Sequence, residues 1–172
     1  MEIREQLERL LGQESIDPRD IPGVELYMDQ VIRFMETRLE DRRSGPEEKL
    51  LTRTMVNNYV KSGLVEKPEK KRYNARQMML LIMIYHMKNV LALGDLKLFL
   101  EDGDPEESVE QLYRMFLEVQ EEVLSDKASL ADSGGDRRTV MKLVLEADLN
   151  KRLAETMIRV REEGRRKDRH GR

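Results

Sequence analysis

The chain contains 172 residues, and its formal net charge at pH 7 is −3. Charged residues make up 38% of it and aromatic residues only 5%, with ten glycines and five prolines, a composition that favours long helices. The absence of cysteine excludes disulfides, thiolate metal sites and a cysteine nucleophile. The N-terminal residues lack the apolar core of a signal peptide, so we expect a cytoplasmic protein without membrane attachment.

The first forty residues predict two amphipathic helices separated by a turn. Apolar side chains recur at helical spacing between residues 3 and 11, and the turn-rich sequence DPRDIPG follows at residues 17–23. Residues 27–39 predict a helix of about four turns, which suits the supporting helix of a helix-turn-helix. In the next linker, Ser44 or the Gly45-Pro46 pair is suited to start a brief extra helical turn.

A short helix is predicted from Thr52, which can cap its start, to Lys61, with Gly63 in a left-handed conformation that ends it. Successive residues rotate by about 100°, which gives the helix two distinct faces. The apolar face is suited to packing on a core and consists of Met55, Val56, Tyr59 and Val60. The polar face contains Arg53, Thr54, Asn57, Asn58 and Lys61.

The polar face of this helix has the chemistry of nucleic-acid recognition. It carries no Asp or Glu, unlike the solvated helix faces elsewhere in the chain. Asparagine can pair with the adenine edge in the major groove, arginine or lysine with guanine, and threonine with phosphate or base. An ordinary capped surface helix shares this pattern, so the helix alone leaves both interpretations open.

Charge is segregated along the sequence. Residues 53–76 contain seven basic and two acidic side chains, and residues 159–172 contain seven basic and three acidic ones, although the whole chain is acidic. A local basic segment on an acidic protein is what phosphate contact requires. The C-terminal sequence GRRKDRHGR has no apolar anchor, and we expect it to fray rather than to bind nucleic acid.

The segment around the short helix carries a family resemblance. Residues 57–64 (NNYVKSGL), followed by Pro68 and by residues 72–74 (RYN), resemble the DNA-binding segment of MerR-type regulators. More closely, residues 26–31 (LYMDQV) and 51–64 (LTRTMVNNYVKSGL) are similar to an uncharacterised bacterial family, domain of unknown function 1836. The likeness covers roughly the first hundred residues and implies a winged helix-turn-helix.

Carried over by residue, the MerR resemblance implies that Val56 and Tyr59 pack against the core, that Asn57 faces the groove, and that residues 70–73 form the wing. MerR-type helices commonly have arginine where Asn57 stands and an aromatic residue where Asn58 stands. The side chains that usually contact the DNA backbone are therefore changed here.

Asn74 is suited to cap a central helix whose middle, residues 78–87, is apolar almost all round. A buried core helix is the first interpretation, and a methionine-rich ligand pocket or dimer interface is the alternative. His86 lies in this run without a second metal-ligand residue at a suitable spacing, so we interpret it as a core residue. Residues 91–100 predict a turn and a further helix.

The C-terminal part predicts a helical hairpin. Asp104 as cap, Pro105 as the first helical residue and Glu107 in a capping box predict the start of a helix with an apolar stripe through residue 124. A polar loop around residues 133–135 separates it from a helix whose apolar stripe runs from residue 140 to 160. The hairpin would pack on the central helix or on a partner chain.

The sequence as a whole predicts an all-α, mainly helical protein with a small β wing. We expect an N-terminal helix and turn (residues 1–23), a MerR-like winged helix-turn-helix (24–101), and a C-terminal helical hairpin with a basic tail (102–172). The chain lacks a glycine-rich phosphate loop, an HExxH motif and a nucleophile elbow. We therefore expect no enzyme activity and predict no catalytic, metal or cofactor-binding residues.

The predicted function is double-stranded DNA binding in transcriptional control. Major-groove contacts are assigned to Arg53, Thr54, Asn57, Asn58 and Lys61, and the wing contributes Lys70, Lys71 and Arg72 to phosphate and Tyr73 as its brace. We expect a homodimer through helix 78–91 or the C-terminal helices. The alternative is a helical protein-interaction module, on the same scaffold, that does not bind DNA.

Overall fold

The computed structural model describes residues 3–40, 49–104 and 106–170, and within them helices dominate. The α-helices are α1 (Ile3–Leu11), α2 (Met28–Arg38), α3 (Arg53–Lys61), α4 (Ala75–Met87), α5 (Leu93–Leu100), α6 (Val109–Lys127) and α7 (Arg137–His170). Two 3₁₀ helices, η1 (Pro18–Asp20) and η3 (Ala128–Asp132), and two short strands, β1 (Leu26–Tyr27) and β2 (Arg72–Tyr73), complete the described elements. The prediction of a mainly helical protein with a minimal sheet is confirmed.

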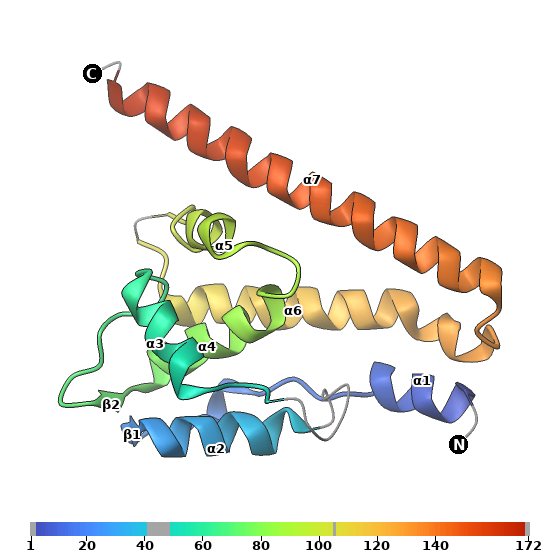
Figure 1. The fold of residues 1–172 in the computed structure, drawn as a ribbon, viewed down its shortest axis with the longest axis horizontal. Coiled ribbons are helices and arrows are strands. Elements are labelled where there is room, and N and C mark those ends of the chain that lie inside the picture. The colour runs from blue at the N-terminus through green and yellow to red at the C-terminus, as the bar shows by residue number, and fades with distance from the viewer. Residues whose placement is uncertain (1–2, 41–48, 105, 171–172) are drawn as a thin grey trace.

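Helix α4 lies at the centre of the molecule, between α2 and α3 on one side and α5 and α6 on the other (Figure 1). Its apolar residues are buried almost without interruption, as the sequence predicts for a helix that is apolar nearly all round. The buried members are Met78, Met79, Leu81, Ile82, Met83, Ile84 and Tyr85, with Gln77 at the N-terminal end. His86 is half-buried beside this core, and its ring lies 5.3 Å from the Phe116 ring, centroid to centroid, at a tilt of 51°.

The small sheet joins two segments that are distant in the sequence. Strand β1 directly precedes α2, and β2 directly precedes Asn74, the residue that caps α4. The strands are antiparallel, with Leu26 opposite Tyr73 and Tyr27 opposite Arg72. The sequence analysis did not identify β1, because two residues are too few to show the alternation that marks a strand.

The limits of α3 agree with the sequence prediction. The Thr52 side chain accepts a hydrogen bond from the Met55 amide at 3.2 Å, and Gly63 follows the helix with a φ of 76°. Val56 and Tyr59 belong to the common apolar core and are 0% and 4% exposed. The helix is therefore held by one face and ended by a residue without a side chain.

Helix α6 begins later than predicted. Ser108, not Asp104, caps it, because Ser108 and Gln111 exchange two hydrogen bonds: the Ser108 hydroxyl accepts from the Gln111 amide at 3.2 Å, and the Gln111 side chain accepts from the Ser108 amide at 2.7 Å. Asp104 instead accepts from the Glu106 amide in a local turn, at 2.9 Å. Pro105, Ser44 and the Gly45-Pro46 pair lie outside the described residues.

The segment after α1 is tied to α6 by two side-chain hydrogen bonds. The Tyr113 hydroxyl donates to the Ile16 carbonyl at 2.7 Å, and the Ser15 hydroxyl donates to the Gln120 side-chain oxygen at 2.6 Å. Tyr113 is fully buried, and burial raises the pKa of its hydroxyl, which therefore remains a proton donor. These bonds anchor the N-terminal region on α6.

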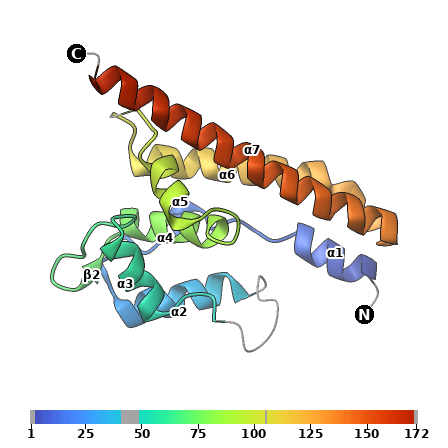
Figure 2. The same ribbon diagram turned by 45° about the horizontal axis from the view of Figure 1, so that its top comes forward.

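Helix α7 continues to His170, so the expectation that the C-terminal sequence frays is wrong for residues 164–170. The helix runs along the outside of the molecule, past α5 and α6 (Figure 2). Ion pairs Arg159–Asp95 and Arg161–Asp102, each at 3.0 Å, fix its C-terminal half to α5 and to the turn that follows α5. The C-terminal basic segment has no apolar anchor of its own, but its arginines form ion pairs with carboxylates on α5 and in the turn after it.

No helix in the described part of the chain is both long enough and apolar enough to cross a membrane.

The Tyr113 hydrogen bond gives a direct test of this architecture. We expect Tyr113→Phe to lower the free energy of unfolding by about 1–3 kcal/mol, because the substitution removes the bond and leaves the Ile16 carbonyl without this donor. Urea denaturation measures the change. Tyr59→Phe is the matched control, since Tyr59 is also buried but its hydroxyl forms no hydrogen bond within the described residues. Equal losses in both variants would contradict the assigned role of the bond.

Candidate nucleic-acid interface

The outer face of α3 consists of the five polar side chains predicted from the helical wheel. Arg53, Thr54, Asn57, Asn58 and Lys61 are all exposed, whereas Val56 and Tyr59 on the opposite face are buried. The helix thus presents two amides, a hydroxyl and two cationic groups on one side. No acidic residue interrupts this surface along the helix.

Arg53 also connects α3 to α2. Its guanidinium forms an ion pair with the Asp29 carboxylate, which lies in the first turn of α2. Both side chains are mostly exposed, 63% for Arg53 and 72% for Asp29, so the pair contributes at most about 1 kcal/mol to stability. A competing anion in solution can therefore displace this carboxylate at little cost.

A tight turn precedes β2 and carries two lysines at its tip. Lys70 and Lys71 have φ values of 46° and 63°, and the Arg72 amide donates to the Glu69 carbonyl across the turn at 2.8 Å. Two successive positive φ angles define a type I′ turn, which favours Asn-Gly. Residues with a Cβ in this region cost about 1–2 kcal/mol each relative to their relaxed conformation. Both lysines are exposed.

The two residues of β2 have different environments. Arg72 is opposite Tyr27 in the sheet, and its side chain forms an ion pair with Glu25 at 3.2 Å. Tyr73 is only 2% exposed, and burial raises the pKa of its hydroxyl. Its ring therefore braces the sheet against the core and does not meet solvent.

Gln77 holds the loop between α3 and the turn in place, a role that the sequence analysis missed. Its side-chain oxygen accepts a hydrogen bond from the Asn74 amide at 2.8 Å, while its side-chain nitrogen donates to the Glu66 carbonyl at 3.0 Å. The residue is 5% exposed. The Asn-x-x-Gln spacing is that of a capping box and is the signal that identifies it.

The fold neutralises part of the basic segment counted in the sequence. Between residues 53 and 76, three arginines form ion pairs with carboxylates from outside the segment: Arg53 with Asp29, Arg72 with Glu25, and Arg76 with Glu110. Lys61, Lys70 and Lys71 form no ion pair within the described residues. The accessible positive charge of this surface is therefore carried mainly by lysines on α3 and at the turn.

The second basic segment, in α7, is largely satisfied within the chain. Besides Arg159 and Arg161, Arg165 lies 3.5 Å from Asp102 and donates to the Glu101 carbonyl at 2.8 Å. Arg166 lies 2.9 Å from Glu162. Arg159, Arg161 and Arg165 hold α7 on α5 and the turn after it, and Arg166 pairs within α7, so these four cations do not form an open phosphate-binding surface.

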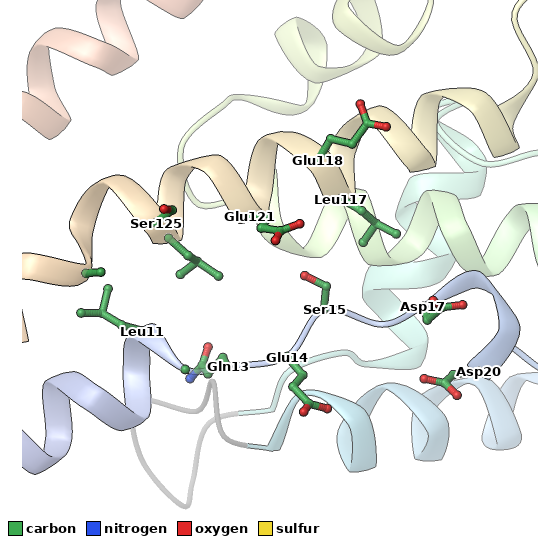
Figure 3. A pocket seen from close by; sticks show the side chains of 13 residues that line it. Leu11, Gln13, Glu14, Ser15, Asp17, Asp20, Leu117, Glu118, Glu121 and Ser125 are labelled. Atoms are coloured by element: carbon green, nitrogen blue, oxygen red, sulfur yellow. The ribbon is translucent and has the colours of Figure 1, made fainter.

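A groove of about 700 Å³ separates α6 from the segment that follows α1 (Figure 3). Leu11, Leu117 and Leu124 contribute apolar surface to it, but its carboxylates are Glu14, Asp17, Asp20, Glu118 and Glu121. The Arg19 guanidinium lowers the pKa of Asp17 to about 2, so this group stays ionised. A groove with this charge repels phosphate, which leaves α3 and the lysine turn as the candidate surface.

Comparison with known proteins identifies a family without a described function. No curated protein and no solved structure matches the chain. The family model described as a domain of unknown function (DUF1836) matches residues 16–116, which include β1, α2, α3, the lysine turn, α4 and α5. Because the match covers more than half of the 172 residues, the chain belongs to the DUF1836 family.

Proposed function

We propose that the protein binds double-stranded DNA, with α3 in the major groove and the turn at Lys70 and Lys71 on the phosphate backbone, and that it acts in transcriptional control. The observation that carries the proposal is the outer face of α3, which combines amide, hydroxyl and cationic groups without a carboxylate. These are the groups that contact base edges and phosphates.

The dimensions of α3 suit this role. Nine residues form a helix about 14 Å long, and the major groove, about 12 Å wide, admits one helix. Asn57 and Asn58 lie in the middle of the exposed face, where a docked helix comes nearest to base edges. Arg53 and Lys61 lie near its two ends, where cationic side chains can reach the flanking phosphates.

The proposal assigns the supporting parts to a winged helix-turn-helix of the MerR-like kind. Helix α2 would be the supporting helix, linked to α3 through Asp29 and Arg53, and the lysine turn would be the wing. Gln77 and the pairing of β1 with β2 restrain the wing relative to the core. A restrained surface binds with a smaller loss of conformational entropy than a mobile loop does.

The left-handed conformation of the two lysines supports a binding role for the turn. An Asn-Gly sequence would make the same turn with less strain, and neither lysine is buried. Strained backbone conformations cluster at functional sites, where the strain is tolerated because it positions a side chain needed for function. At this turn the side chains presented are two ammonium groups without a carboxylate partner among the described residues.

The rival function is protein interaction, in which the same basic surface would bind an acidic partner. The observation in its favour is that Arg53, Arg72 and Arg76 are already paired with carboxylates of the chain. Selection of genomic fragments with the purified protein separates the two functions. Enrichment of a shared sequence motif supports the DNA proposal, whereas fragments without any shared motif contradict sequence-specific regulation.

We expect the double variant Lys70→Asn, Lys71→Gly to be more stable and yet to bind DNA more weakly. Relief of the positive-φ strain should raise the free energy of unfolding by about 1 kcal/mol, after allowance for the extra freedom of glycine in the unfolded chain. The slope of log K against log salt should become shallower by about 0.9 for each phosphate that the variant no longer neutralises. Urea denaturation and fluorescence anisotropy across a salt series measure the two effects.

Lys142→Ala is the matched control for the turn variant, because Lys142 is an exposed lysine on α7, away from the proposed interface. It should leave the salt slope unchanged. If the double variant gains stability and keeps full DNA affinity, the turn does not contribute to DNA binding.

Replacement of both Asn57 and Asn58 with alanine should reduce sequence preference. Each bidentate contact to a base contributes about 1–3 kcal/mol of discrimination. We therefore expect the ratio of affinities for a selected and a scrambled duplex to fall by about tenfold or more, while stability changes by no more than about 0.5 kcal/mol. Competition binding gives the ratio, and Asn89→Ala, at an exposed site after α4, is the control. An unchanged ratio would exclude the two asparagines from base recognition.

A further inference from the structure

Helix α7 leaves an unusually large apolar surface in contact with solvent. Five of its apolar side chains occur at every fourth position. Their exposed fractions are 56% for Met141, 63% for Leu145, 50% for Leu149, 46% for Leu153 and 63% for Met157. Soluble proteins rarely expose contiguous apolar surface of this kind unless a partner covers it. We call these five residues the α7 ridge.

The α7 ridge is symmetric about Leu149. Its sequence is Met, Leu, Leu, Leu, Met, so that reversal of the helix direction gives the same order of side chains. Two copies of α7 in antiparallel orientation, related by a two-fold axis at Leu149, would place Leu145 against Leu153 and Met141 against Met157. Such a self-complementary patch is what a two-fold symmetric interface requires.

The spacing of four residues defines how two such helices meet. Side chains at positions i, i+4 and i+8 form a ridge inclined to the helix axis, and two ridges of this type interdigitate when the helices cross at about 50°. The three central leucines would form the contact in that geometry. The methionines at the two ends, which have flexible side chains, can adapt to the diverging helices.

The charges beside the α7 ridge favour the antiparallel orientation. Asp148 and Arg152 flank Leu149 and lie 2.6 Å apart in one chain. Around a two-fold axis at Leu149, Asp148 of each chain comes close to Arg152 of the other. In a parallel pair the two-fold axis would run along the helices, so these residues of the two chains would lie on opposite edges of the interface and would not pair.

The C-terminal half of α7 is held on its other side by contacts within the chain, whereas Val140, Leu143 and Val144 in the N-terminal half are exposed like the ridge. Ile158 is 8% exposed, and the carboxylates of Asp95 and Asp102, which pair with Arg159 and Arg161, belong to side chains only 12% and 16% exposed. These contacts fix the C-terminal half of α7 on α5 and the turn after it. They leave the α7 ridge exposed.

We propose that the α7 ridge pairs with the same ridge of a second copy of this chain, antiparallel about Leu149. The apolar run of α4 offers no comparable surface, since it is buried within the chain. Self-association through α7 does not depend on DNA binding. The experiments below can therefore contradict self-association without contradicting DNA binding, and the reverse also holds. If both hold, the two copies of α3 are related by a two-fold axis and the DNA site is an inverted repeat.

Because the chain has no cysteine, single cysteines report directly on the pairing. Leu149→Cys should form a disulfide with its own copy under mild oxidation, whereas Leu145→Cys and Leu153→Cys should each do so poorly but cross-link when mixed. Disulfides need Cα atoms within about 7 Å, which facing positions of packed helices satisfy. Pairing raises the local concentration to about the millimolar range, so at about 10 µM protein the reaction should be about a hundredfold faster than for unpaired chains.

Val119→Cys is the matched control, because Val119 on α6 is 49% exposed, nearly the same as Leu149. Cross-linking of Leu149→Cys no faster than the control would overturn the proposal. Equal self-cross-linking at positions 145, 149 and 153 would indicate a parallel pair and would also overturn it.

The solution mass gives an independent test. The unmodified protein should sediment at twice the 20.3 kDa mass of one chain, and Leu149→Asp should sediment as a monomer with unchanged circular dichroism, because Leu149 makes no part of the buried core. A monomeric unmodified protein that adheres through α7 to anionic vesicles would show that a lipid surface, not a second copy, covers the α7 ridge.

Discussion

The burial of α4 is the constraint on which the rest of the structure depends. A helix that is apolar almost all round needs cover on every side, and each large side chain removed from water contributes about 1.5–3 kcal/mol. Helices α2 and α3 provide the cover on one side and α5 and α6 on the other (Figure 1). Since α3 shares this core through Val56 and Tyr59, its polar face has to point outward.

The sequence predicted those features that depend on neighbouring residues. The limits of α3, its two faces, the Asn74 cap and the buried α4 all follow from helical periodicity and from residues within one turn of each other. Strand β1 was missed because it owes its existence to residues 72–73, far along the chain. The start of α6 was misplaced because two capping sequences compete there, and only Ser108 and Gln111 satisfy each other.

Electrostatics was the least predictable property, because counting charges along the chain ignores what the fold brings near. Residues 53–76 are strongly basic in the sequence, but in the fold the carboxylates of Glu25, Asp29 and Glu110 form ion pairs with arginines of this segment. The tail is likewise paired with carboxylates on and after α5. The cationic side chains that remain free to bind phosphate are a smaller set of lysines. The proposed interface therefore contains fewer available positive charges than the basic segment of the sequence suggested.

The two proposed surfaces lie on different parts of the chain. The polar face of α3 and the lysine turn fall within residues 16–116, the part that defines the family, whereas the α7 ridge lies beyond it. Substitutions at sites that share no contacts are usually additive, so changes on the α7 ridge should not disturb α3 directly. Self-association through α7 would therefore be a property added to the family domain, and it would act on DNA recognition only by setting the distance and orientation between two copies of α3.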